Sequence, residues 1–197
     1  MIISYLCKVE LHDILTRIYP LPKESIDKIE SLADKIYVDR NKEIISADRV
    51  CHDVFFVAKG IVRAFYYGKG REITFWIGAE GSVAVSMQSY INGRAGYETI
   101  ETLEDCILFR LDGSVLQSLY TTDIHIANWG RKFAEKEILK TEKNLIPQLF
   151  TTGKERYENL LKEQPELLNR ISLENIASYI GITPVSLSRI RSEYAKG

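Results

Sequence analysis

The sequence predicts an α+β fold in which a β-roll or jelly roll with flanking helices leads into a long helix and a C-terminal helix-turn-helix. Three observations indicate this fold class. About eight short β-rich segments, separated by Gly and Asn turns, fall between residues 35 and 111. A long helical pattern runs from Asp123 to about Ile146. Two short helices joined by a tight turn then fit the stretch from Ile171 to Lys196.

Residues 1 to about 33 favour two helices. Isoleucines at helical spacing occur on either side of a break at Pro20 and Pro22. Pro22 suits the start of the second helix, because its missing N–H would have no helical partner there.

The β-rich part changes to short segments bounded by turn residues. We expect strands at Lys35–Val38, Glu43–Ile45, Val54–Lys59, Ile61–Tyr67, Glu72–Ile77, Ser82–Val85, Tyr97–Thr102 and Cys106–Arg110. Gly68, Lys69 and Gly70 predict an exposed hairpin tip. Strands of this length and number indicate a small barrel, roll or jelly roll.

A short helix from Asp112 to Tyr120 and a longer one from Asp123 to about Ile146 follow the strands. Pro147 ends or kinks the longer helix, and we place a hinge between Pro147 and Gly153. One stripe of this helix is apolar, which is typical either of core packing or of a dimer seam. The candidate dimer-interface residues on it are Ile126, Trp129, Phe133, Ile138 and Leu145.

The C-terminal stretch has the capping and turn residues that are typical of a helix-turn-helix. Ser172 is a good N-cap, Gly181 permits a sharp turn, and Thr183 with Pro184 begins the second helix. We expect Leu173, Ile176, Ala177 and Ile180 on the inner face of the first helix, and Leu187, Ile190 and Tyr194 on that of the second. An ordinary αα-hairpin is the competing interpretation.

Short polar and arginine side chains on the second helix suit the major groove of DNA, where Arg can bind guanine through two hydrogen bonds. The candidate DNA-binding residues are Thr183, Val185, Ser186, Ser188, Arg189 and Arg191. From Arg170 to Gly197, four basic and two acidic residues leave an excess of two positive charges. This modest excess predicts weak binding by one copy and a contribution from dimerisation.

Composition restricts the other classes of function. The chain has 197 residues and a formal net charge of −1. Its three cysteines and three histidines are scattered without metal-ligand spacing, so we expect no metal site and no enzyme of the cupin type. The odd cysteine count, the lack of a secretory signal and the short apolar runs predict a cytoplasmic protein without membrane association.

The order of parts resembles the Crp/Fnr superfamily of bacterial transcription regulators. Two stretches carry the resemblance, Val54–Arg63 with its Gly-x-hydrophobic turn and Ile176–Arg191 in the helix-turn-helix. The resemblance implies a cyclic-nucleotide-binding-like sensor and a homodimer bound to double-stranded DNA. It places Pro184, Val185 and Arg189 at base-reading positions, and RNA polymerase and an unknown small-molecule effector are further partners that it implies.

The ligand cassette departs from the family pattern. The expected Gly-Glu pair falls on Val85 and Ser86, and the arginine expected to bind the cyclic phosphate falls near Gly96. A buried phosphate needs a paired charge, so we expect that the family's cyclic nucleotide site is lost, with no identifiable cofactor. Residues expected near the family's pocket are Ser82, Ser86, Gln88, Arg94, Tyr97 and Thr99.

We therefore expect a β-roll sensor-like domain at residues 1–122, a dimerisation helix and hinge at 123–150, and a DNA-binding domain at 151–197. The family's β-hairpin wing has no counterpart before Gly197, so the last domain is expected to lack a full wing, whether natively or because the chain is cut short. The predicted function is a sequence-specific DNA-binding regulator that does not respond to cyclic AMP. The alternative is a small-molecule-binding or protein-interaction module whose tail helices contact protein.

Overall fold

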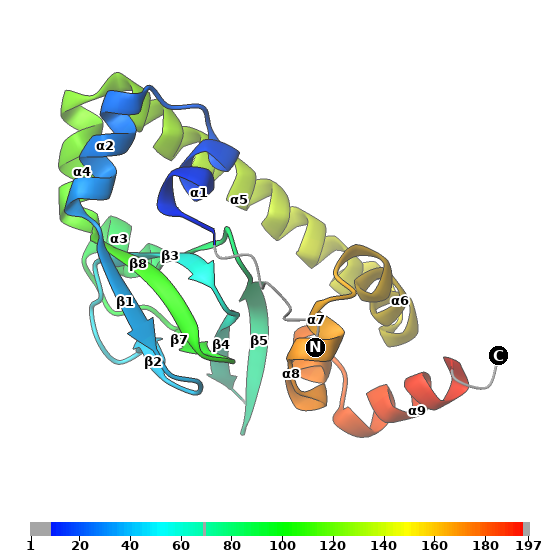
Figure 1. Cartoon of the computed structure of the whole chain (residues 1–197). Coiled ribbons are helices and arrows are strands. Elements are labelled where there is room, and N and C mark those ends of the chain that lie inside the picture. Colours follow the sequence, from blue (N-terminus) through cyan, green and yellow to red (C-terminus); the bar gives the residue numbers. More distant parts are fainter. Residues whose placement is uncertain (1–8, 69, 195–197) are drawn as a thin grey trace, which may run out of the picture. The chain divides into compact units, whose positions relative to one another are not determined.

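The computed structural model describes residues 9–68 and 70–194 (Figure 1). Its first part contains α1 (Leu11–Ile18), α2 (Lys23–Leu32), β1 (Asp34–Val38), β2 (Glu43–Ile45), β3 (Asp53–Lys59), β4 (Val62–Gly68), β5 (Arg71–Gly78), β6 (Val83–Ala84), α3 (Met87–Asn92), β7 (Thr99–Thr102) and β8 (Cys106–Asp112). The remainder contains α4 (Gly113–Thr122), α5 (Ile124–Phe150), α6 (Gly153–Glu163), α7 (Leu167–Arg170), α8 (Leu173–Tyr179) and α9 (Pro184–Tyr194). The predicted fold class and each predicted strand are confirmed.

The chain divides into two compact units. The first comprises the described residues up to Ala64 together with Ile77–Glu137. The second comprises Phe65–Trp76 and the described residues from Ile138 onward. The β4–β5 hairpin and α5 are therefore each shared between the units, and the functional boundaries placed after residues 122 and 150 stay predictions.

The strands form two antiparallel sheets among the described residues, in the orders β1-β8-β3-β6 and β2-β7-β4-β5. β3 is interior to its sheet and pairs with β8 in the register Phe56 to Phe109. Its residues from Val54 to Ala58 are all buried, as expected for a strand that is covered on both faces. Gly60 follows with φ +104°, and a Cβ there would lie 2.4 Å from the Cys106 sulfur.

The core of the first unit joins β3, β8 and the helices α1, α2, α4 and the start of α5. Trp129 is fully buried, and its ring stacks on Phe133 at 5.7 Å between centroids. The prediction that Ile126 and Trp129 face a partner chain is therefore wrong. Both side chains are enclosed by α1 and the sheet of their own chain, while Phe133 is partly buried against the same core.

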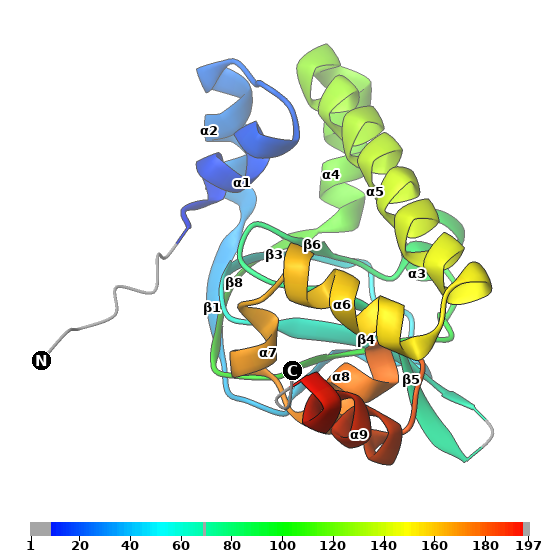
Figure 2. The same ribbon diagram turned by 90° about the vertical axis from the view of Figure 1, so that its right-hand side faces the viewer.

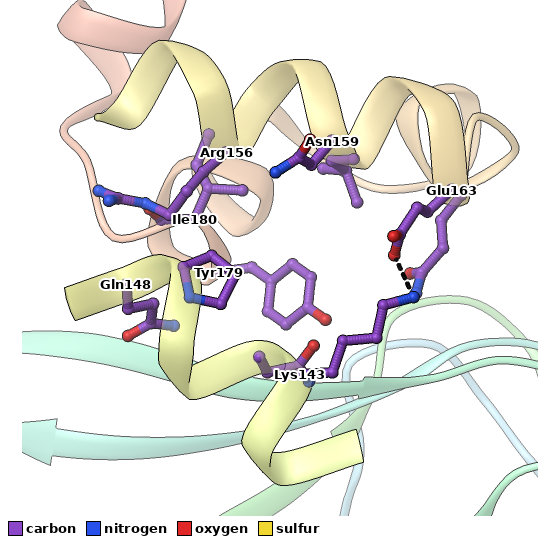
Figure 3. A pocket seen from close by; sticks show the side chains of 11 residues that line it. Lys143, Gln148, Arg156, Asn159, Glu163, Tyr179 and Ile180 are labelled. Carbon is purple, nitrogen blue, oxygen red and sulfur yellow. Dashed lines mark hydrogen bonds and ion pairs between the residues drawn. The ribbon is translucent and has the colours of Figure 1, made fainter. Parts of the chain in front are cut away.

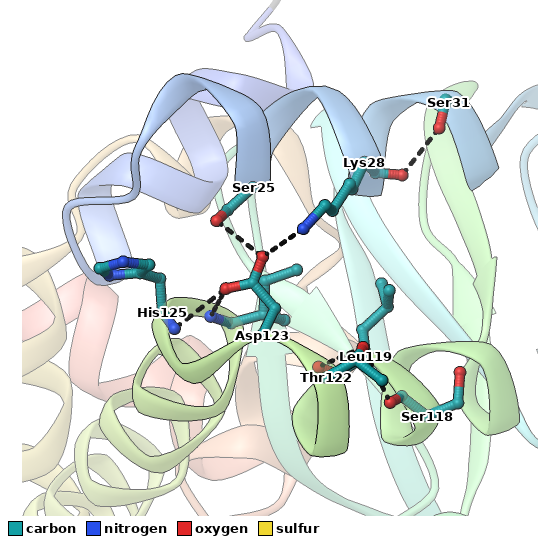
Figure 4. Close-up of polar contacts among 9 residues, drawn as sticks. Ser25, Lys28, Ser31, Ser118, Leu119, Thr122, Asp123 and His125 are labelled. Atoms are coloured by element: carbon teal, nitrogen blue, oxygen red, sulfur yellow. Dashed lines mark hydrogen bonds and ion pairs between the residues drawn. The ribbon is translucent and has the colours of Figure 1, made fainter.

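A buried carboxylate begins α5 (Figure 4). Asp123 accepts hydrogen bonds from the hydroxyl of Ser25 (3.0 Å), the amine of Lys28 (2.9 Å) and the backbone N–H groups of His125 and Ile126. The contact with Lys28 and the other hydrogen bonds lower the pKa of Asp123 to about 2. The carboxylate thus caps α5 and joins it to α2.

The second unit holds the last part of α5 and the helices α6 to α9 (Figure 2). α5 continues through Pro147 to Phe150. Of the two expected effects of Pro147, ending the helix or kinking it, the first is therefore wrong. The Pro147 carbonyl accepts from both the N–H and the hydroxyl of Thr151, which satisfies the last turn. A capping box between Thr152 and Glu155 then starts α6. No helix within residues 9–68 and 70–194 is long and apolar enough to cross a membrane.

Candidate nucleic-acid interface

The first helix of the motif, α8, packs through its small and apolar side chains. The hydroxyl of Ser172 accepts from the N–H of Asn175 and caps the helix, as predicted. Ile176, Ala177 and Ile180 are buried on its inner face. Leu173 was expected there too, but it is the first residue of α8 and is 41% exposed.

Gly181 forms the turn between the two helices. Its φ is +72°, a left-handed conformation that glycine adopts without strain from a Cβ. The N–H of Ile182 then donates to the carbonyl of Ala177 at 2.9 Å, which closes the end of α8. The turn therefore has the geometry that the sequence predicts.

The second helix, α9, starts at Pro184 with Thr183 as its N-cap. The Thr183 hydroxyl accepts from the N–H of Ser186 at 3.1 Å. Leu187 and Ile190 are buried against the rest of the motif. Tyr194 was expected on the same inner face but is 46% exposed, because it lies at the end of the helix, where its ring makes an edge contact with the ring of Tyr157 and its hydroxyl a hydrogen bond with Glu158.

The remaining face of α9 is open. Val185 is 81% exposed, Ser186 is half-buried, and the other candidate DNA-binding residues are exposed: Thr183, Ser188, Arg189 and Arg191. Neither Arg189 nor Arg191 forms a hydrogen bond or ion pair with any described residue. Two guanidinium groups are thus exposed on different sides of α9, and the N-terminus of the same helix has a dipole that favours a phosphate. Lys196, one of the four basic residues of this C-terminal stretch, lies outside the described residues.

A serine of α8 also contacts the β4–β5 hairpin within the second unit. The Ser178 hydroxyl accepts from the N–H of Thr74 at 2.8 Å and donates to the carbonyl of Glu72 at 3.1 Å. β5 is the edge strand of its sheet, so Ser178 covers backbone groups that a neighbouring strand would otherwise use.

The predicted pocket residues do not share one environment. Ser86 is fully buried as the N-cap of α3, whereas Arg94 and Tyr97 are exposed. Gln88 accepts a hydrogen bond from Asn92 on its own helix. The hydroxyl of Thr99 accepts from the N–H of Ala47, and Ser82 is half-buried after β5.

A buried carboxylate lies beside Gly96, the position near which the resemblance led us to expect a phosphate-binding arginine. Glu98 is 6% exposed and accepts from the N–H of Tyr97. A Cβ on Gly96 would lie 2.6 Å from the hydroxyl oxygen of Ser86 and 2.7 Å from both carboxylate oxygens of Glu98. A side chain at position 96 would therefore require the side chains of Ser86 and Glu98 to shift, and a phosphate bound beside Glu98 would meet a like charge.

The apolar surface of α5 lies further along the helix than predicted. Ile138 and Leu145, two of the predicted dimer residues, are exposed. Four apolar residues that the sequence analysis did not select are exposed beside them: Leu139, Ile146, Leu149 and Phe150. Spacings of seven and four residues group these six side chains into two adjacent rows on one helix face. The repeated apolar pairs were the signal that could have identified them.

The described residues contain no cluster of three His, Cys, Asp or Glu side chains able to hold a metal ion. Cys51 is a half-buried free thiol and Cys106 a buried one, and Cys7 lies outside the described residues. Burial raises the pKa of the Cys51 thiol.

Solved structures share this fold over most of their length. FixK2 from Bradyrhizobium japonicum has 20% identity and a TM-score of 0.74, covering 83% of this chain and 85% of that chain. The c-di-GMP-responsive global regulator CLP from Xanthomonas campestris has 15% identity and a TM-score of 0.72, with coverage of 89% and 92%. A structure described as a transcriptional regulator of the Crp/Fnr family from Eubacterium rectale has 17% identity and a TM-score of 0.72, with coverage of 92% and 89%.

No family model and no curated protein matches the chain. The likeness therefore concerns the fold, in which a β-roll, a long helix and a helix-turn-helix follow one another in the same order. The chain has the fold of the Crp/Fnr regulators.

Proposed function

We propose that this chain is a sequence-specific, double-stranded-DNA-binding transcription regulator that acts as a homodimer. The observation that carries the proposal is α9, which is buried through Leu187 and Ile190 and presents Val185, Arg189 and Arg191 outward. Arg189 is suited to bind guanine, and Val185 to contact a thymine methyl group. Ser186, Ser188 and Thr183 are suited to phosphates or base edges.

The local charge and the exposed face of α5 support the homodimer in this proposal. A single helix-turn-helix with a small positive excess binds DNA weakly, whereas two copies read two half-sites together. The exposed rows on α5 (Ile138, Leu139, Leu145, Ile146, Leu149 and Phe150) supply an apolar helix face for pairing two copies. RNA polymerase is the further protein partner that we propose for such a regulator.

The proposed regulator does not respond to cyclic AMP and is not an enzyme. Support for the first statement comes from Glu98, whose buried carboxylate opposes a phosphate, and from Gly96, which offers no cation. An effector of a different kind stays compatible with the β-roll.

Selection from a random duplex pool tests the proposal. Full-length protein is incubated with the pool at low and moderate salt, with and without small-molecule extract, and the bound duplexes are sequenced. We expect a two-fold-symmetric site whose half-sites lie about one helical turn, roughly 34 Å, apart. Selection of a single asymmetric site would contradict the proposed homodimer. Enrichment only in the presence of the extract would indicate that the protein needs a small-molecule effector.

The competing function is a module whose tail helices contact protein. The exposed apolar rows on α5 are the observation that favours it, since they also suit a partner helix. The same selection separates the two functions, because a protein-contact module should retain no duplex even at low salt.

A further inference from the structure

We propose that Arg156 is a positioning residue for the recognition helix, tying the start of α9 to the end of α5. This inference rests on the proposed function, because the position of α9 matters only if α9 reads DNA. Figure 3 shows Arg156 on α6 with its guanidinium group beside Ile180.

The guanidinium group joins two chain ends inside the second unit. Its Nε donates to the carbonyl of Ile180 at 2.7 Å, and its Nη1 donates to the carbonyl of Thr151. Thr151 is the first residue after α5, and Ile180 is the C-cap of α8. One side chain therefore holds the hinge and the turn of the motif at once.

Fixing the position of the Ile180 carbonyl also restricts the position of the first turn of α9. Ile180 is buried, and its carbonyl belongs to the last groups of α8, which have no partner within that helix. Gly181, with φ +72°, follows directly, and the N-cap of α9 is Thr183. A shift of the Ile180 carbonyl is therefore passed to the first turn of α9 through a chain of only a few bonds.

The planar fork of arginine is needed for this arrangement. Two donors on one rigid group point at two carbonyls, whereas the ammonium of lysine is a single compact centre on a flexible stem. The side chain lies in the wall of a cavity of about 130 Å³ that is also lined by Lys143, Asn144, Glu163 and Tyr179. Lys143 and Glu163 form their own ion pair at 2.8 Å, so the carboxylate of Glu163 already has a cationic partner other than Arg156.

The same arginine could instead act as a contact to DNA phosphate, and the experiment separates the two roles. Full-length wild-type protein, R156K and R156Q are titrated with the selected duplex and with a random-sequence duplex over a salt series. K162Q is the matched control, because Lys162 is an exposed cation on the same helix with no partner among the described residues. The DNA-competent fraction is counted by stoichiometric titration, so loss of folded protein does not enter the affinities.

We expect R156K and R156Q both to lose about tenfold in affinity for the selected duplex. Their affinity for the random duplex and the salt slope should stay at the wild-type values, because no phosphate contact is lost. K162Q should behave as wild type. A purely structural role would lower the competent fraction and leave the ratio of the two affinities unchanged.

Two results would overturn the inference. A parallel loss on both duplexes with a salt slope smaller by about one unit, rescued by R156K, would assign Arg156 to phosphate. Wild-type specificity in the competent fraction of R156K would show that the fork is not needed, and R156K decides this if R156Q does not fold. If wild-type protein selects no sequence, the proposed function itself fails, which is a different outcome from either.

Discussion

The indole N–H of Trp129 donates to the backbone carbonyl of Leu15 at 2.9 Å, and both residues are fully buried. The bond joins α5 to α1 across 114 residues of sequence. It gives the large side chain a specific place in the core, rather than a place in an interface between copies.

Replacing Trp129 with Phe should lower the free energy of unfolding by about 1–3 kcal/mol, because the Leu15 carbonyl keeps only the N–H of Tyr19 as a donor and the smaller ring leaves space in the core. W129A should cost more, about 3–5 kcal/mol, through the added cavity. Urea denaturation of the two variants measures both. A dimer dissociation constant that rises with W129F at unchanged stability would instead return Trp129 to the interface.

Asp123 should make stability depend on acid pH. Its pKa is lowered from 3.8 to about 2, chiefly by the contact with Lys28. Its stabilising contribution is therefore complete above pH 3.8 and is lost as the pH falls through 2, where the folded protein also takes up the proton. D123N should lose about 1–2 kcal/mol at neutral pH and flatten the stability profile in that window. An unchanged slope between wild type and D123N would contradict the assignment.

The exposed rows on α5 should carry self-association. The double variant L145E/L149E places two charges in the apolar face, and we expect the dimer dissociation constant to rise at least about tenfold. Sedimentation equilibrium measures it. I91E serves as the control, since Ile91 is an exposed apolar residue of α3 outside the rows. Equal effects of both variants would point to general loss of apolar surface.

Arg189 should contribute to base readout. R189A should lower affinity for the selected duplex by about 1–3 kcal/mol and relax the base preference at one position of each half-site. Binding to a random duplex should fall less. Repeating the duplex selection with R189A gives the base preference directly, and an unaltered preferred sequence would remove Arg189 from readout.

Gly181 should tolerate substitution poorly for a backbone reason. G181A places a Cβ on a residue with φ +72°, which costs about 1–2 kcal/mol. The open space around Gly181, with the Arg156 guanidinium 3.9 Å from the added carbon, means that crowding adds little. G181N should be milder, since Asn visits this conformation more readily. Thermal unfolding of both variants checks the order.

The sequence was most informative where local signals decide the structure. The caps at Asp112, Thr152, Ser172 and Thr183 and the turn at Gly181 lie within a few residues of the groups they bind, so each helix start could be predicted. Trp129 was misassigned because an apolar stripe has the same spacing in a core and in an interface. Its partner Leu15 is too distant in sequence to be inferred.

For the same reason, only part of the candidate DNA-binding site could be predicted from the sequence. The outward residues of α9 follow from helical periodicity around Leu187 and Ile190. Arg156 carries no such signal, because its partners Thr151 and Ile180 are backbone carbonyls, which every residue possesses. The lack of space for a side chain at Gly96 likewise depends on how closely the side chains of Ser86 and Glu98 approach it. The spacing of residues in the sequence does not give these distances.

The bond between Ser178 and Thr74 spans 104 residues, so this part of the second unit closes only after the C-terminal helices have been synthesised. Until then, the Thr74 N–H and the Glu72 carbonyl lack the hydroxyl that covers them in the folded chain. A nascent or proteolysed chain that ends before α8 would expose these backbone groups on the edge strand β5. Exposed edge strands can pair with strands of other molecules and cause aggregation. Ser178 of the motif proposed to read DNA thus covers two backbone groups of an edge strand that is synthesised about a hundred residues earlier.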